Sequence, residues 1–215
     1  MTSHELMSAT KTTMPVAVPE LLLFDLGGVL VDFSGIRDLP RFMRRQKSTA
    51  EVRRAWIDCR IVRAFEAGAL TPARFAERFV EEWELSLSAE DFLQEFRQWT
   101  RGLLPGAAEM LTALHARFRL ACLSNSNPAH WDRNREIALF DYFDVTLSSH
   151  LLGCHKPEPL IYERALAILD VRPEAIAFFD DIAENVDGAR TAGMRAFEVS
   201  GIAELRACLT EQGWL

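Results

Sequence analysis

Six polar side chains with the chemistry of a binding or catalytic site stand beside short apolar runs or loops of this sequence. They combine carboxylate, hydroxyl, amide and ammonium groups: Asp25, Ser124, Asn125, Lys156, Asp180 and Asp181. Gly27 and Gly28 follow Asp25 and leave bare backbone amides beside it. Carboxylate oxygens bind hard divalent cations, and ammonium, hydroxyl and backbone N–H groups stabilise phosphoryl oxygens. Gathered at one place, these groups suit a divalent cation together with a phosphoryl group.

The elements expected around these residues bring them to one edge of a sheet. Leu21–Phe24 is a continuous apolar run, typical of a strand buried on both faces. Further along, the pattern alternates between strands expected at 118–123, 145–147, 175–179 and 195–199 and helices expected at 107–117, 128–137, 158–169, 183–192 and 202–211. This alternation predicts an α/β fold with a doubly wound parallel sheet. Ligands bind such sheets beyond the carboxyl ends of the strands.

Between the first strand and this alternating region the periodicity is helical. Thr71 and Pro72 mark the start of one helix, and Ser88 is an N-cap for the next. Aromatic residues recur along these helices, and we expect them to form a local core: Phe75, Phe79, Phe92 and Phe96. The stretch shows no strand pattern, so an all-helical segment is expected.

These patterns divide the chain into three parts. Residues 1–19 are expected to be a flexible leader, in which Met14 is an alternative start. Residues 20–35 and 104–215 are expected to form the α/β core, and residues 36–103 an all-helical cap inserted after its first strand.

Composition limits the classes of partner. The chain of 215 residues is 49% hydrophobic and has a formal net charge of -7, which argues against nucleic acid or an anionic membrane as the main partner. No apolar run is long enough for a transmembrane helix. The four cysteines form no CxxC pair, which is typical of a protein of the reducing cytoplasm. The oligomeric state cannot be predicted from these features.

One segment departs from the acidic average. Residues 37–63 hold nine basic and three acidic residues. Two interpretations fit equally: a solvated helical face, or a cap surface whose arginines attract an anionic substrate.

Four sequence motifs resemble, in order and placement, those of the haloacid dehalogenase-like hydrolase superfamily. They are FDLGGVLVD, LSNSN, KPEPLIYERAL and FFDDIAENVDGARTAGM. The resemblance covers nearly all of the chain after Glu20, and the helical insert lies where the first (C1) cap type of that superfamily lies. The FDLGG opening is also similar to that of a YihX-like group of sugar-phosphate phosphatases.

The resemblance implies a role for each residue. Asp25 would be the nucleophile, forming an aspartyl-phosphate that water then hydrolyses. Ser124, Asn125 and the Gly27–Gly28 backbone would bind the phosphoryl group, and Lys156 would neutralise its charge and separate Asp25 from Asp180. Mg²⁺ would be held by Asp25, the main-chain carbonyl of Gly27 and Asp181, with Asp180 supporting through water. Only three of the 24 basic residues are lysines, so an ammonium at 156 is a distinctive choice over a guanidinium.

One position departs from the superfamily pattern. Most of its phosphatases carry a second Asp two residues after the nucleophile, acting as general acid and base, and here that position is Gly27. Losing such assistance typically costs about 10²–10⁴-fold in rate. Three explanations are open: a substrate with a good leaving group, a proton supplied by His155, His150 or a cap residue, or a weakly active or non-catalytic phosphate-binding protein.

Hydrolysis of 2-haloacids is a second chemistry of the superfamily. Those enzymes also lack the second Asp, and LSNSNP resembles their second motif. They need no metal and do not keep the acidic pair, so Asp180 and Asp181 favour phosphate over halide. The sequence therefore predicts a cytoplasmic, Mg²⁺-dependent phosphomonoester hydrolase for a small phosphorylated metabolite, with a sugar phosphate as one candidate.

Overall fold

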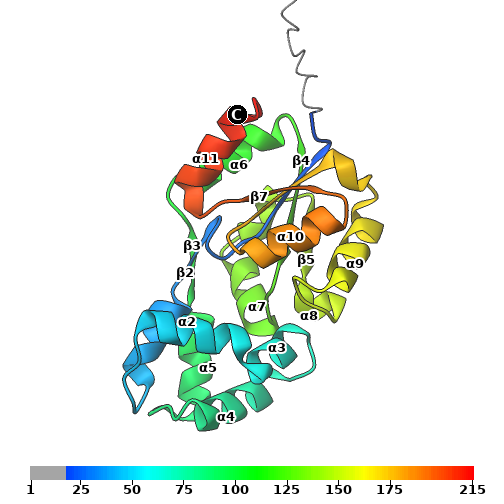
Figure 1. Cartoon of the computed structure of the whole chain (residues 1–215). Helices are drawn as coiled ribbons and strands as arrows, with labels where there is room; N and C mark the ends of the chain where they lie inside the picture. Colours follow the sequence, from blue (N-terminus) through cyan, green and yellow to red (C-terminus); the bar gives the residue numbers. More distant parts are fainter. Residues whose placement is uncertain (1–17) are drawn as a thin grey trace, which may run out of the picture.

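The computed structural model of the chain describes residues 18–215. The predicted leader lies outside the described residues except for its last two, and so does Met14. Figure 1 shows a core built around a sheet, with a group of helices below it that forms the cap. Among the described residues no helix is both long and apolar enough to cross a membrane.

A five-stranded parallel sheet forms the centre of the core. Its strand order is β5-β4-β1-β6-β7, so β1 is the middle strand. The strands are β1 (Leu21–Phe24), β4 (Arg119–Ser124), β5 (Val145–Ser148), β6 (Ile176–Asp180) and β7 (Arg195–Glu198). The predicted α/β class with a parallel sheet is confirmed, and the predicted strand ends differ from these by at most one residue.

The apolar run of β1 is continuous because both faces of the sheet are covered. Leu22 and Phe24 pack on one side, with α6 (Ala107–His115) and α11 (Gly201–Glu211). Leu21 and Leu23 pack on the other side, with α9 (Pro159–Leu169) and α10 (Ala183–Thr191). All four β1 side chains are fully buried, as expected of a central parallel strand. The remaining core elements are α7 (Pro128–Glu136), α8 (Ser149–Leu152) and the 3-10 turns η2 (Leu139–Tyr142) and η3 (Pro173–Ala175).

The connections create a crevice at the carboxyl end of β1. From the cap the chain enters β4 on one side of β1, whereas β6 pairs with the other side. Phe24 is in register with Cys122 of β4 and with Phe179 of β6. The residues that follow these positions therefore emerge at one level, and doubly wound sheets bind ligands at such a switch point.

The cap consists of short helices around an aromatic core. Its elements are α1 (Gly35–Asp38), η1 (Leu39–Phe42), α2 (Thr49–Asp58), α3 (Arg60–Glu66), α4 (Pro72–Glu82) and α5 (Ala89–Arg97). The aromatic rows expected to form its core do so, because Phe75, Phe79, Phe92 and Phe96 are fully buried against one another. Ser48, Thr71 and Ser88 accept a backbone hydrogen bond at the starts of α2, α4 and α5.

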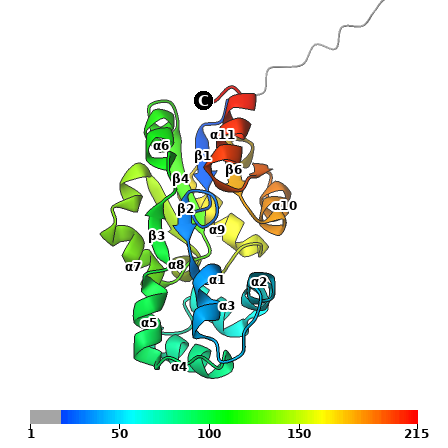
Figure 2. The same ribbon diagram turned by 90° about the vertical axis from the view of Figure 1, so that its left-hand side faces the viewer.

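The prediction of helices alone in the inserted segment is wrong at its last residues. Thr100–Leu103 forms strand β3, which pairs antiparallel with β2 (Val31–Phe33). Figure 2 shows this two-stranded ribbon between the core and the cap. A strand of four residues that contains a glycine carries no clear alternation of its own, so its conformation depends on the distant partner strand.

Candidate active site

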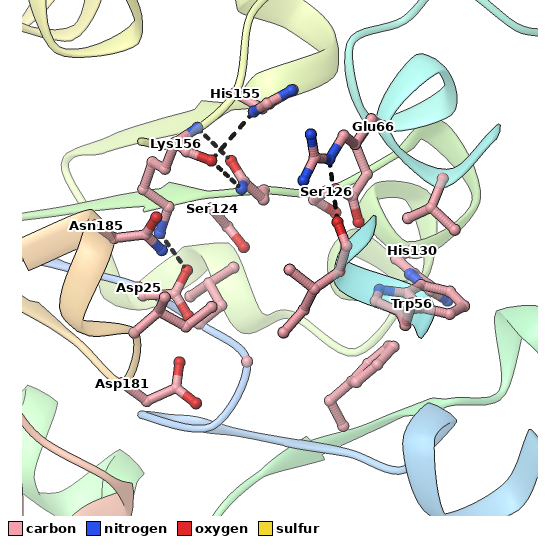
Figure 3. A pocket seen from close by; sticks show the side chains of 18 of the residues that line it. Asp25, Trp56, Glu66, Ser124, Ser126, His130, His155, Lys156, Asp181 and Asn185 are labelled. Carbon is pink, nitrogen blue, oxygen red and sulfur yellow. Dashed lines mark hydrogen bonds and ion pairs between the residues drawn. The ribbon is translucent and has the colours of Figure 1, made fainter. Parts of the chain in front are cut away.

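A cavity of about 640 Å³ lies where the cap faces the carboxyl ends of β1, β4 and β6. From the core, the predicted residues Asp25, Ser124, Asn125, Lys156 and Asp181 line it, together with Gly27. Figure 3 shows the core side chains around one part of this space and cap residues, Trp56 and Glu66 among them, around another. The fold thus gathers the residues that the sequence analysis selected.

Lys156 is the link between the core residues. Its Nζ donates to Asp25 Oδ1 at 2.7 Å, to Asp180 Oδ2 at 2.6 Å and to the carbonyl of Leu123 at 2.9 Å. The side chain is almost fully buried. Burial opposes the charged ammonium, but attraction to Asp180 and Asp25 outweighs it and raises the pKa of Lys156. The ammonium therefore stays charged and lies between the two carboxylates.

Asp25 occupies the position directly after β1, and its N–H donates to Phe179 O at 2.8 Å. Burial raises the pKa of its carboxyl group, Lys156 opposes that effect, and Asp180 and Asp181 add to it. The backbone bond and the Lys156 bond fix the carboxylate at the edge of the cavity, where one oxygen can approach an electrophile.

The side chain of Asn125 holds the main chain of Lys156 in place. Its Nδ2 donates to Lys156 O at 2.9 Å, and its Oδ1 accepts from Lys156 N at 2.8 Å. The side-chain amide expected to contact a phosphoryl oxygen is therefore engaged with the main chain of Lys156. This contact joins the end of β4 to the loop before α9, 31 residues further along the chain.

Asp180 is fully buried and fully hydrogen-bonded. Its Oδ2 accepts from Lys156, while Oδ1 accepts from Ile182 N at 2.9 Å and from Asn185 Nδ2 at 3.0 Å. Three donors hold this carboxylate in one orientation. Asp180 thereby positions Lys156 and the turn that carries Asp181.

Asp181 lies against the loop that follows β1. A Cβ built on Gly28 would come within 2.6 Å of Asp181 Oδ2, and Gly28 has a φ of +82°. Burial and the neighbouring Asp180 raise the pKa of Asp181, and Arg53 opposes them. Arg53, on helix α2 of the cap, approaches Asp181 Oδ2 with its Nη2 at 3.4 Å.

The donors present suit Mg²⁺. Asp25, Asp181 and the main chain of Gly27 supply hard oxygen atoms on one wall of the cavity. Among residues 18–215, no three His, Cys, Asp or Glu side chains form a ready-made metal centre. Mg²⁺ does not require one, because it is usually held by one or two carboxylates, substrate phosphate and several waters.

Two serines lie beside these charged groups. Ser124 is buried at the end of β4, and its hydroxyl makes no hydrogen bond within the described residues, so it can donate to a ligand. Ser126, which the sequence analysis did not select, also lines the cavity. Its N–H and carbonyl both bond to Ser149 Oγ at 2.9 Å, which fixes the loop after β4.

The side chains of three histidines in or near the cavity already have hydrogen-bond partners within the protein. His155 contacts Lys156 O through Nδ1 and Glu158 through Nε2, at 3.1 and 3.0 Å. His150 bonds to Ser148 Oγ at 2.6 Å and is absent from the cavity wall. His130, which was not selected from sequence, lines the cavity, and burial lowers its pKa to about 4. Its two ring nitrogens bond to Asn127 and to Phe96 O.

The cap wall is apolar with two charged residues. Phe33, Trp56, Ile57 and Val62 supply the apolar surface, and Arg63 and Glu66 the charges. Of the nine basic residues at 37–63, only Arg63 lines the cavity and Arg53 reaches Asp181. Arg41 and Arg45 instead pair with Asp38 and Glu84, respectively. Most of the basic segment is thus a solvated face, with a minority of its residues directed at the site.

Comparison with known proteins identifies the family. Residues 19–193 match the model of the haloacid dehalogenase-like hydrolases, and the chain belongs to this family. It is 29% identical to a phosphatase of Mycobacterium tuberculosis over 193 residues, covering 86% of this chain and 89% of that protein. It is 25% identical to a D-ribitol-5-phosphate phosphatase of Bacteroides thetaiotaomicron over 197 residues, covering 88% and 96%.

A solved structure shares the fold. The crystal structure of a HAD family enzyme from Bacteroides thetaiotaomicron, in complex with magnesium and inorganic phosphate, superposes with a TM-score of 0.67 at 22% identity. The match covers 84% of this chain and 93% of that one. The match to the family model over residues 19–193 confirms the sequence-based assignment to the superfamily, and the chain is a hydrolase of this class.

Proposed function

We propose that the chain is a Mg²⁺-dependent phosphomonoester hydrolase that acts on a small organic phosphate. The contact of Lys156 with Asp25 and Asp180, beside Asp181, carries this proposal, because it presents a nucleophilic carboxylate next to a fixed cation. Relatives over most of the chain are a phosphatase and a D-ribitol-5-phosphate phosphatase, which supports phosphate rather than halide as the substrate.

In the proposed reaction an oxygen of Asp25 attacks phosphorus. The leaving alcohol departs, an aspartyl-phosphate forms, and water then releases inorganic phosphate. Lys156 balances the charge of the phosphoryl oxygens, and the Ser124 hydroxyl donates to one of them. Asn125 and Asp180 act indirectly, because they hold the main chain and the ammonium of Lys156.

Asp25, Asp181 and the carbonyl of Gly27 would hold the magnesium ion, with Asp180 behind them. When bound, the ion supplies positive charge that offsets the repulsion between the carboxylates and an anionic substrate. Within the described residues, Lys156 is already shared between two carboxylates. Additional positive charge is therefore needed to bind an anionic substrate beside them.

The cap wall bears on the substrate class. Its apolar surface, with Trp56 and Phe33, suits an organic group with an apolar face, and Arg63 adds one cation. A sugar phosphate stays a candidate, since a sugar ring also presents C–H faces to aromatic side chains. The cytoplasmic location also stays a prediction.

Hydrolysis of 2-haloacids and phosphate binding without turnover are the competing functions. Gly27, which leaves the usual acid–base position without a carboxyl group, is the feature that favours each of them. The carboxylate of Asp181 beside the Gly28 loop favours a metal-dependent reaction instead.

A panel of phosphate esters and of 2-haloacids, assayed with Mg²⁺ and with chelator, separates the three functions. Chelator-sensitive phosphate release that Asp25→Asn abolishes is the expected result. Halide release that survives chelation would show dehalogenase chemistry, and ligand binding without turnover would show a binding protein. Either outcome would overturn the proposal.

A further inference from the structure

A phosphatase site needs a group that gives a proton to the leaving alcohol, and the usual position for it is Gly27. The histidines near the cavity do not fill this role well. His130 is neutral and engaged at both nitrogens, His150 is absent from the wall, and His155 is engaged by Lys156 O and Glu158. The group must therefore be sought on the opposite wall of the cavity.

Glu66 stands on that wall. It is the last residue of α3 and lines the cavity from the cap. Figure 3 shows its side chain reaching into the space that Asp25 and Lys156 border from the core. The carboxyl group is partly buried and has no hydrogen bond or ion pair within residues 18–215. Two other glutamates of the cavity wall, Glu158 and Glu184, are exposed.

The surroundings of Glu66 make it able to exchange a proton near neutral pH. Burial raises its pKa to about 7, the charges of Lys156 and Arg63 lower it, and the charge of Asp25 raises it. His155 and Glu158 also line this cavity, from the core. A buried carboxyl group without a partner is costly to keep, and such groups cluster at functional sites.

We infer that Glu66 is the general acid and general base of the proposed phosphatase reaction. This inference rests on the proposed function and deepens it. In phosphoryl transfer the attacking and leaving oxygens are roughly in line through phosphorus. With Asp25 attacking from the core, the leaving oxygen points away from the core, toward the cap wall where Glu66 lies. The substitution at Gly27 is thereby offset by a residue of the cap.

The two steps balance with water as the only co-reactant. In the first step the Asp25 oxygen forms a bond to phosphorus, the bond from phosphorus to the ester oxygen breaks, and protonated Glu66 gives its proton to that oxygen. In the second step the Glu66 carboxylate takes a proton from water, whose oxygen bonds to phosphorus while the bond to Asp25 breaks. Alcohol and inorganic phosphate leave, and Asp25 and Glu66 return to their starting states.

The decisive variant is Glu66→Gln, assayed with Mg²⁺ on two esters that differ in their need for a proton. For 2-phenylethyl phosphate, whose alkoxide must be protonated, we expect kcat/KM to fall about 10²–10⁴-fold. For 2,4-dinitrophenyl phosphate, whose phenolate leaves unaided, we expect kcat/KM to change less than about tenfold. Its kcat should still fall, because the second step lacks its base, and a burst of about one phenolate per site should appear.

A rescue experiment uses the free space at residue 27. A Cβ on Gly27 would meet only Phe33 Cβ, at 3.9 Å, so the backbone there admits a residue with a side chain. We expect Gly27→Asp in the Glu66→Gln background to recover at least tenfold of the lost rate on 2-phenylethyl phosphate. Glu81→Gln, at an exposed position of α4 outside the cavity wall, is the matched control and should behave as the wild-type chain does.

The outcomes distinguish the two proposals. A wild-type chain that hydrolyses no phosphate ester would overturn the proposed function, and the role of Glu66 with it. Equal losses of kcat/KM on both esters without a burst, or no loss at all, would overturn the role of Glu66 alone. Thermal unfolding of Glu66→Gln provides the folding control, because removing an unpartnered buried carboxylate should not lower stability.

Discussion

Arg53 of the cap contacts Asp181 of the core, with Nη2 at 3.4 Å from Oδ2. The two residues are 128 positions apart in the sequence, and the contact joins α2 of the cap to the turn after β6. Asp181 is also a proposed ligand of Mg²⁺, so with the ion bound the guanidinium and the metal would compete for the same carboxylate. In that case the cap would act on the metal affinity of the core.

We predict that Arg53→Gln binds Mg²⁺ more tightly than the wild-type chain. Arg53 is more than half exposed, and exposed ion pairs contribute about 0.2–1 kcal/mol, so the gain in affinity should be roughly 1.4–5-fold. Calorimetric titration of the substrate-free protein measures it. Arg54→Gln, the neighbouring position outside the cavity wall, is the control. Equal affinities for the Arg53 and Arg54 variants would show that the contact does not compete with the metal.

Removing the ammonium of Lys156 should destabilise the fold as well as stop the reaction. Lys156→Met leaves Asp25 and Asp180 buried without their shared cation, and breaking a buried ion pair costs about 3–5 kcal/mol. Denaturant unfolding at pH 7.5 measures this loss. Lys47→Met is the control, since Lys47 is exposed and its ammonium lies over the Trp83 ring. A Lys156→Met chain as stable as the Lys47 variant would contradict the role given to the ammonium.

The Asn125 side chain should matter through the position of Lys156. Asn125→Ala removes two hydrogen bonds to the Lys156 main chain, and a small displacement of a catalytic group can cost about 10²-fold in rate. We expect kcat to fall by about that factor. Asn125→Asp keeps the acceptor for Lys156 N and should be less destabilised than Asn125→Ala. An unchanged kcat in Asn125→Ala would exclude this positioning role.

Gly28 and Gly27 should respond differently to the same substitution. Gly28→Ala places a Cβ within 2.6 Å of Asp181 Oδ2, on a residue with a φ of +82°, so it should displace the Asp181 carboxylate and weaken Mg²⁺ binding at least tenfold. Gly27→Ala meets only Phe33 Cβ at 3.9 Å and should bind the ion as the wild-type chain does. Mg²⁺ titration of both variants decides the matter, and equal affinities would argue against Asp181 as a ligand.

His130 should make stability depend on pH in the acid range. Burial lowers its pKa to about 4 from an ordinary 6.5. As the pH falls below 6.5, His130 binds a proton in the unfolded chain, whereas in the folded chain it binds one only near pH 4. The free energy of unfolding therefore decreases between pH 6.5 and pH 4. The loss from this one group is about 3 kcal/mol.

The measurement is the free energy of unfolding at pH 7 and pH 4.5 for the wild-type chain and His130→Gln. The variant should be less stable at pH 7, because it loses the Phe96 stacking, but it should lose less between the two pH values. His115→Gln removes an exposed ring that pairs with Asp144, and such exposed pairs contribute only about 0.2–1 kcal/mol, so its pH dependence should stay much closer to that of the wild-type chain than that of His130→Gln. Parallel pH curves for all three chains would rule out His130 as the source.

Sequence patterns were sufficient to predict which side chains of the α/β core come together at the site. A continuous apolar run such as Leu21–Phe24 marks a strand covered on both faces, and parallel strands present their following residues at one edge, so the convergence of Asp25, Ser124 and Asp180 could be predicted. The bond between Asn125 and Lys156 could not, because it depends on the path of a loop.

The cap side of the site was beyond the sequence patterns. Glu66 is one glutamate among many, and Arg53 is one of nine basic residues in its segment. Which of them faces the cavity depends on how α2 and α3 dock against the core, and that docking is set by contacts between residues far apart in the chain. Strand β3 was not predicted for the same reason: its extended conformation depends on pairing with β2, which lies far away in the sequence.

Because of the β2–β3 ribbon, the cap could be exchanged for another inserted segment. Phe33 pairs with Thr100, so the chain leaves for the cap and comes back from it at neighbouring points. An insert of another length or fold, spliced between these two residues, would leave all five strands of the core sheet uncut. If Glu66 supplies the proton as inferred, chimeras with transplanted caps would change substrate choice while retaining Asp25 and Lys156, and each foreign cap would need a proton donor of its own or an aspartate at residue 27.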